Sequence, residues 1–182
     1  LAWSDAIIDG EPYPIKAAII QGSNPCTSFP NSHKVQEAFG KLEFLAVHDF
    51  YMNETAKFAD IFLPAAFPIE QETMLDYTNH FAPLLFLGRK AIDPPGECTG
   101  NWKLWFELGR RMGYANYFPW QNELGFYEEL LEPTDISLKE LMAHPTGIWH
   151  HDPNERQRYL KEGFNTPSGK VELSSQTMKD YG

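Results

Sequence analysis

Three short apolar runs in the first third of the chain predict a parallel β-sheet. They cover residues 15–21, 42–47 and 61–63, and they contain the β-branched and aromatic side chains that strands favour. Ser32 can cap a helix that continues to about Phe39 and is closed by Gly40, and Asn53 can cap a short one over residues 54–58. Because strands and helices alternate, right-handed crossovers should join the strands. The pattern predicts an α/β fold, a three-layer Rossmann-like parallel sheet with flanking helices and long proline-rich connections.

The rest of the chain alternates between irregular and helical patterns. Residues 1–14 are expected to be an irregular lead-in, and residues 64–100 a long connection of the kind that is usually functional or covered by another domain. A helix is expected to begin at Thr99 or Asn101 and to end at Gly113. Further helices are expected over 124–131 and 137–144, and a strand over 170–173, after a turn at 164–169. The apolar side of the first helix consists of Trp102, Trp105, Phe106, Leu108 and Met112.

Composition and charge exclude several classes of function. With 182 residues, 42% of them hydrophobic, the chain can form one domain with a core, or one domain and part of a second. The formal net charge of −10 excludes a nucleic-acid backbone as a partner. No apolar run approaches the roughly 18 residues of a membrane helix. The first residue is Leu1 and no signal segment follows it, so we expect the chain to begin inside a longer protein.

A glycine-containing turn, Gly22-Ser23-Asn24-Pro25, follows the first predicted strand directly. In an open parallel sheet, ligands bind at the carboxyl edge of the strands. Glycine there lets a ligand approach the backbone, and an asparagine offers both a donor and an acceptor. Taken alone, the same four residues are more often an ordinary Asn-Pro turn.

His48 and Asp49 end the second predicted strand, so they should lie beside the turn at 22–25. A carboxylate there can accept two parallel hydrogen bonds, from a ribose diol or from the N1–H and N2–H₂ edge of a guanine. An aspartate that only caps its own loop is an equally good interpretation.

Taken together, five ordered segments resemble the molybdopterin oxidoreductases, a family that includes formate dehydrogenases, nitrate reductases and dimethyl sulfoxide reductases. The segments are G-x-N-P at 22–25, H-D at 48–49, E-T-A at 54–56 followed by A-D-I-F-L-P at 59–64, P-G-E at 95–97, and T-P-S-G-K-V-E at 166–172. The resemblance covers nearly the whole chain. It implies a Rossmann-like domain over 1–163, then a linker and the first strand of a truncated C-terminal barrel domain over 164–182.

The same resemblance implies a cofactor and the residues that bind it. The cofactor is a molybdenum or tungsten ion held by two pterins, each extended by a guanine dinucleotide. In this chain the expected contacts to one dinucleotide arm are Asn24, His48 and Asp49. The predicted cofactor-binding set adds the neighbouring or more weakly matched positions Gly22, Ser23, Pro25, Thr55, Gln71 and Asn101.

Two of these positions, and one longer stretch, depart from the family pattern. Relatives often have a basic residue where Gln71 stands and an acid near Asn101. The stretch 70–80 replaces the family's E-x-x-G-T-x-x-N-x-E-G-R. Because that stretch helps to line the route to the metal, the sequence leaves the substrate undecided.

Other candidate chemistry is less specific. His150 and His151 with Asp152 could chelate a metal at the surface, but an adjacent pair on a polar loop is more often only solvated. Cys26 and Cys98 form no CxxC pair, and Cys26 is expected to be a packing residue. No catalytic triad or paired carboxylates stand out.

The chain is therefore predicted to hold the cofactor and to catalyse nothing alone, with no catalytic or metal-ligating residue of its own. The expected partners are the other domains of the same polypeptide and an iron–sulfur electron-transfer subunit. An iron–sulfur cluster would belong to the missing N-terminal part, and no bound cofactor is expected in the isolated chain. One alternative is a non-catalytic scaffold in an electron-transfer complex. Another is a dinucleotide-binding dehydrogenase domain, which would need G-x-G-x-x-G after the first strand.

Overall fold

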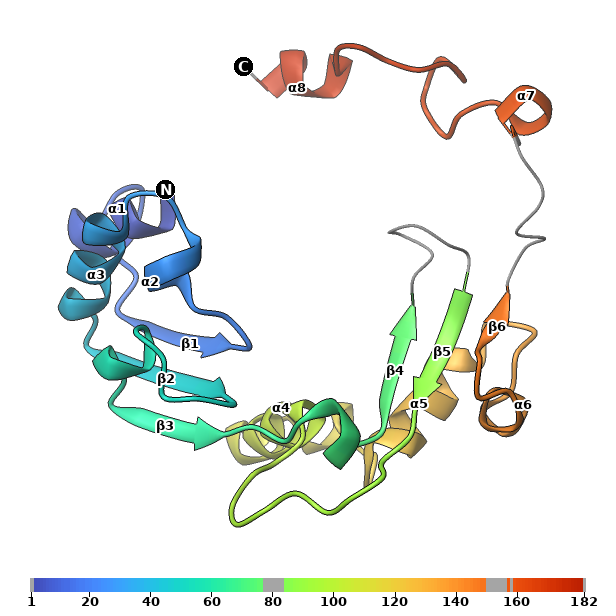
Figure 1. The fold of residues 1–182 in the computed structure, drawn as a ribbon. Helices are drawn as coiled ribbons and strands as arrows, with labels where there is room; N and C mark the ends of the chain where they lie inside the picture. The colour runs from blue at the N-terminus through green and yellow to red at the C-terminus, as the bar shows by residue number, and fades with distance from the viewer. Residues whose placement is uncertain (1, 77–83, 150–156, 158, 182) are drawn as a thin grey trace.

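A parallel three-stranded sheet forms the first part of the protein (Figure 1). The computed structural model describes residues 2–76, 84–149, 157 and 159–181. In strand order the sheet consists of β1 (Ala17–Gln21), β2 (Phe44–Asp49) and β3 (Ile61–Pro64). Gln21 lies opposite His48, and Asp49 lies opposite Pro64. The predicted parallel sheet is confirmed, and the ends of its three strands share one carboxyl edge.

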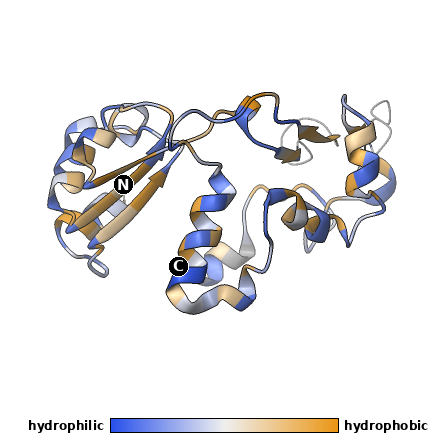
Figure 2. Ribbon diagram, turned by 90° about the horizontal axis from the view of Figure 1, so that it is seen from below, coloured by the Kyte–Doolittle hydropathy of each residue, from blue (hydrophilic) through white to orange (hydrophobic). Residues whose placement is uncertain are grey.

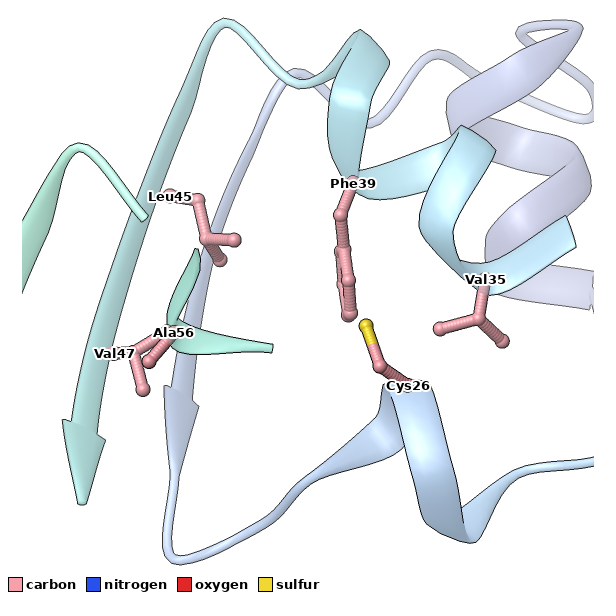
Figure 3. Close-up of a cluster of buried hydrophobic side chains, with 6 residues drawn as sticks. All are labelled: Cys26, Val35, Phe39, Leu45, Val47 and Ala56. Atoms are coloured by element: carbon pink, nitrogen blue, oxygen red, sulfur yellow. The ribbon is translucent and has the colours of Figure 1, made fainter. Parts of the chain in front are cut away.

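Helices pack on one face of this sheet and bury a core. The strands are predominantly apolar (Figure 2), and Figure 3 shows Phe39 within the cluster, with Leu45 and Val47 on the strand side. Each fully buried Val or Leu contributes about 1.5–3 kcal/mol, so this cluster fixes the helices on the sheet. Cys26 is 2% exposed, which confirms it as a packing residue. The helices are α2 (Pro25–Ser28), α3 (Ser32–Lys41) and the 3₁₀ turn η1 (Ala56–Phe58), and the cluster is Cys26, Val35, Phe39, Leu45, Val47 and Ala56.

The predicted helix between β1 and β2 is confirmed, with different ends. Asn31, in a left-handed conformation, is the cap, and its side chain accepts from the Lys34 N–H at 3.3 Å. Ser32 is therefore the first helical residue rather than the cap. The helix also continues through Gly40 to Lys41, because nothing there requires the left-handed conformation that ends a helix at glycine.

The short helix expected over 54–58 contracts to the single turn η1. Asn53 has the capping role that its position predicts, because its Oδ1 accepts from the Ala56 N–H at 2.9 Å. The chain then turns directly into β3, which leaves no room for a full helix.

The chain's start is helical rather than irregular. Helix α1 (Ala2–Ile8) packs against α3, where Trp3 stacks on Phe39 with ring centroids 5.5 Å apart. Ala6 is buried, and its spacing of three from Trp3 places both on one helix face.

A second, antiparallel sheet corrects the expectation of a long irregular connection. Its strand order is β4-β5-β6, and it joins β4 (Thr73–Asp76), β5 (Leu84–Gly88) and β6 (Ile148–Trp149). Leu85 and Leu87 alternate with more exposed neighbours in β5, and they pack against Leu131 and Leu141. Before β4 lies the 3₁₀ turn η2 (Pro68–Glu70).

Helices between β5 and β6 match the predicted ones closely. Trp105 and Met112, expected on the apolar side of the first helix, are instead 41% and 63% exposed. The helix itself ends at Gly109, earlier than predicted, and Gly113, at φ 91°, is a non-helical residue inside the π turn that follows. In order, the elements are α4 (Asn101–Gly109), the π turn η3 (Arg110–Tyr114), the 3₁₀ turn η4 (Ala115–Tyr117), α5 (Glu123–Leu131) and α6 (Leu138–Ala143).

The strand expected over 170–173 is not formed. Those residues lie in bends and irregular chain between α7 (Tyr159–Glu162) and α8 (Gln176–Tyr181). Leu173 is 98% exposed, so its side chain is not packed against an apolar neighbour among the described residues. In the described residues, no helix combines the length and the apolar character needed to cross a bilayer.

Candidate functional site

The turn after β1 leaves its backbone accessible. Gly22 has φ +57°, and its N–H donates to the carbonyl of His48 at 3.0 Å. A Cβ built on Gly22 would have no atom within 4 Å, so the space over this backbone is open. Ser23 is half-buried, and the buried Pro25 begins α2. Glycine is needed here for the backbone conformation, and it also lets another molecule approach the main chain closely.

Asn24 holds this turn to the segment before η1. Its Oδ1 accepts from the hydroxyl of Thr55 at 2.7 Å and from the Thr55 N–H at 3.2 Å. Its Nδ2 donates to Glu54 at 3.3 Å. The Thr55 hydroxyl also accepts from the Cys26 N–H at 3.1 Å, and Thr55 is fully buried. Asn24 and Thr55, both predicted to contact the cofactor, therefore connect two loops of the protein itself.

Glu54 lies beside Asn24 at the same edge. A bond from its own backbone N–H, and then bonds from Lys57 and Asn24, lower the pKa of this exposed carboxyl below its usual value. Lys57 Nζ lies 3.3 Å from the carboxylate. These bonds favour the ionised form of Glu54 beside Asn24, and the Lys57 ammonium balances its charge.

Asp49 presents a carboxylate where β2 ends. Its Oδ1 accepts from the Phe50 N–H at 2.7 Å, and its Oδ2 accepts from Asn53 Nδ2 at 3.0 Å. A carboxylate has about four lone-pair positions, so one bond to each oxygen leaves capacity on both. The half-buried Asp49 can therefore cap its own loop and still accept from a ligand. The two interpretations of this residue are compatible.

His48 is buried, and its ring is bonded on both sides. Its Nδ1 lies 3.0 Å from Gln21 Nε2, and its Nε2 lies 3.3 Å from the carbonyl of Thr99. Burial lowers the pKa of His48 below its usual value of 6.5, against smaller opposing effects of the Thr99 carbonyl and the Asp49 carboxylate. His48 is only 1% exposed, so its ring supports the carboxyl edge of the sheet from inside the protein, through its contacts with Gln21 and Thr99.

Gln71 and Asn101, the two positions that depart from the family pattern, bond to each other. Gln71 Oε1 accepts from the Asn101 N–H at 3.2 Å, and Gln71 Nε2 donates to the Ala66 carbonyl at 2.8 Å. Gln71 is 8% exposed, whereas Asn101 is exposed at the start of α4. A Cβ on Gly100 would lie 2.8 Å from Gln71 Oε1, so this approach needs the glycine.

Sequence reasoning missed Gln21 and Trp105. Gln21 Oε1 accepts from Trp105 Nε1 at 2.8 Å, and Gln21 Nε2 lies 3.4 Å from Asn101 Oδ1. The signal was available, because Gln21 is a polar residue that ends an apolar strand directly before Gly22. Trp105 was assigned to an apolar helix face, where its N–H would have had no partner.

The described part of the chain contains no cluster of metal-ligating side chains. Nowhere among the described residues do three or more His, Cys, Asp or Glu side chains lie close enough together to hold a metal ion. The candidate chelate at His150, His151 and Asp152 lies outside the described residues. In the stretch 70–80, which departs from the family pattern, residues 73–76 form β4, and residues 77–80 lie outside the described residues.

Comparison with known proteins identifies the family of the chain. The sequence profile of the molybdopterin oxidoreductases matches residues 7–111, which include the whole parallel sheet and α4. The chain belongs to the molybdopterin oxidoreductase family. The assimilatory nitrate reductase catalytic subunit of Bacillus subtilis is 33% identical over 182 residues, which is 93% of this chain. The thiosulfate reductase molybdopterin-containing subunit of Salmonella typhimurium is 27% identical over 97% of this chain.

Acetylene hydratase from Pelobacter acetylenicus has a similar structure, with a TM-score of 0.78 and 25% identity over 98% of this chain. The chain spans only 25%, 26% and 24% of the lengths of these three relatives, in the order given. Their names refer to nitrate, thiosulfate and acetylene, so the likeness selects no substrate for this member of the family.

Proposed function

We propose that this chain holds one guanine-dinucleotide arm of a molybdenum or tungsten pterin cofactor, and that it is inactive without the rest of a longer enzyme. One observation carries the proposal. In a chain of this family, the open backbone at Gly22 and the Asp49 carboxylate lie at the ends of two adjacent parallel strands. Ligands of open α/β sheets bind at that edge.

The residues at this edge fit the chemistry of a guanine nucleotide. Asp49 retains acceptor capacity on both oxygens, which matches the two donors on one edge of guanine. Gly22 leaves room for the approach of a sugar or phosphate to the main chain. The side chains of Asn24, Thr55 and His48 contribute by fixing the loops that carry Asp49 and Gly22.

This arrangement gives the cofactor and the chain different roles. The bound cofactor would supply the redox chemistry, and this chain supplies binding and orientation of one arm. Iron–sulfur clusters and an electron-transfer partner, if the full-length enzyme has them, belong to parts outside these 182 residues. The scaffold alternative gains no support from the site, since Asn24 and Asp49 are both present and in position. The absence of G-x-G-x-x-G disfavours the dehydrogenase alternative.

Asp49→Asn in the full-length enzyme tests the proposal. The substitution keeps the size but turns a donor toward a guanine donor, and a charge-assisted bond contributes about 1.5–3 kcal/mol. Cofactor affinity should fall roughly tenfold or more. Molybdenum or tungsten content by elemental analysis, and guanosine monophosphate released by acid hydrolysis, should fall together with activity. Asp49→Ala should behave similarly.

Asp93→Asn is the matched control. Its carboxylate is 91% exposed and pairs with Lys90 in the loop between β5 and α4. Metal and nucleotide content should stay at the unmodified level, and far-ultraviolet circular dichroism should show all variants folded. Full metal content and normal turnover in Asp49→Asn would make Asp49 a structural loop residue and would remove the guanine assignment.

A further inference from the structure

Gln21 occupies a central place among the groups at the carboxyl edge of the sheet. Its side-chain amide makes three contacts: with His48 Nδ1 at 3.0 Å, with Asn101 Oδ1 at 3.4 Å and with Trp105 Nε1 at 2.8 Å. The three partners come from two elements, β2 and α4. One amide therefore connects β1 to the neighbouring strand and to the helix.

The directions of these bonds fix the protonation state of His48. Trp105 Nε1 can only donate, so the Gln21 oxygen accepts and the Gln21 nitrogen carries both donors. His48 Nδ1 must then accept and be unprotonated. Its proton lies on Nε2, where it can donate to the Thr99 carbonyl.

The same amide fixes the beginning of α4. Asn101 and Trp105 are four residues apart on the helix, so they lie on one face, and both reach Gln21. Thr99, just before the helix, is bound to the end of β3 by N–H donation to the Pro64 carbonyl at 3.0 Å. Figure 1 shows α4 close to the carboxyl ends of the strands.

We propose that Gln21 is a positioning residue, whose amide fixes the ring of His48 and the first turns of α4 against the edge where the dinucleotide site is proposed. The identity of the ligand in this inference rests on the proposed function, whereas the contacts of Gln21 are independent of it. Gln21 acts through His48, whose carbonyl in turn accepts from the Gly22 N–H. It therefore controls the spacing between the Gly22 turn and α4.

Gln21→Glu tests the proposal with almost no change of shape. The carboxylate can still accept from Trp105, but it removes the donor to His48 Nδ1. With a carboxylate at Nδ1 and the Thr99 carbonyl at Nε2, both ring nitrogens favour a proton. The neighbouring Asp49 carboxylate acts in the same direction in both proteins.

The pKa of His48 should rise by about one pH unit or more in Gln21→Glu, followed by ¹⁵N chemical shifts of labelled imidazoles. The chain has only six histidines, which makes assignment practicable. Gln21→Met removes all three contacts but leaves the bond from His48 Nε2–H to the Thr99 carbonyl, so the Nε2–H tautomer should persist while the ¹⁵N shift of Nδ1 moves to that of a nitrogen without a hydrogen-bond donor. Gln121→Glu, the same change at an exposed loop position, should leave His48 unaffected.

In the full-length enzyme, both Gln21 variants should retain less molybdopterin guanine dinucleotide than Gln121→Glu. Trp105→Phe, which keeps an aromatic ring but loses the N–H, should reduce the content as well. An unchanged His48 spectrum in both Gln21 variants would overturn the positioning role, and so would unaltered cofactor content. If the unmodified enzyme contains no guanine nucleotide, the proposed function fails, while the His48 spectra still decide how Gln21 acts.

Discussion

At Gly22, the backbone conformation rather than the surrounding space decides which residue fits. The left-handed conformation costs a residue with a Cβ about 1–2 kcal/mol, although no atom here lies within 4 Å of an added Cβ. We expect Gly22→Ala to lower the free energy of unfolding by about that amount, measured by urea titration.

Gly40→Ala is the companion measurement. Gly40 lies inside α3, its φ is not positive, and an added Cβ again meets nothing within 4 Å. Alanine there should raise stability by up to about 0.5–1 kcal/mol, because glycine loses more conformational freedom on entering a helix. Changes of the same sign in both variants would contradict the assignment of strain to Gly22.

His48 makes stability depend on pH in a predictable direction. Burial lowers the pKa of the folded imidazole below 6.5, so the unfolded chain takes up a proton first as the pH falls. The contribution of His48 is therefore fully present above about pH 6.5 and is lost as the pH falls from there through the folded-state pKa. Between about pH 7.5 and pH 5.5, the free energy of unfolding should therefore fall by more in the unmodified protein than in the His48→Gln variant.

Urea midpoints at the two pH values measure this difference. The other five histidines are common to both proteins and cancel in the comparison. Equal losses in the two proteins would show that His48 is not held neutral by the fold.

At the scale of elements, the packing of α4 depends on one glycine. A Cβ on Gly109 would lie 2.3 Å from the ring of Phe118, which also packs near Phe106 and Trp120. We expect Gly109→Ala to destabilise the protein by about 1–3 kcal/mol, because this ring has packed neighbours and cannot move freely. Thermal unfolding should show the loss, and adding Phe118→Leu should recover part of it. A neutral single substitution would mean that the ring moves aside without cost.

The antiparallel sheet shows why elements can be missed in a sequence. Strand β5 is a continuous apolar run, and the prolines around it favour a loop interpretation. Its partners β4 and β6 are four and two residues long, too short to show a period. Only pairing with residues far along the chain turns these segments into strands.

For the whole molecule, the proposal predicts an inactive polypeptide. The isolated 182-residue chain holds at most one arm of a cofactor with two, so binding should be too weak to survive purification. Elemental analysis should find no stoichiometric molybdenum, and assays with artificial electron acceptors should find no oxidoreductase activity. Stoichiometric metal in the purified chain would overturn this expectation.

The sequence alone determined the family and the parallel sheet, and it predicted the place of the site. All three can be read from the local sequence, because apolar runs define the strands. Gly22 directly follows the first strand, and Asp49 ends the second. The tertiary structure decided what each side chain does. Asn24, Thr55 and His48 bond to partners about 30 to 50 residues away, and Gln21 meets Trp105 84 residues along the chain. Hydrogen bonds between groups so distant in sequence depend on how helices and strands pack, and no local pattern encodes that packing.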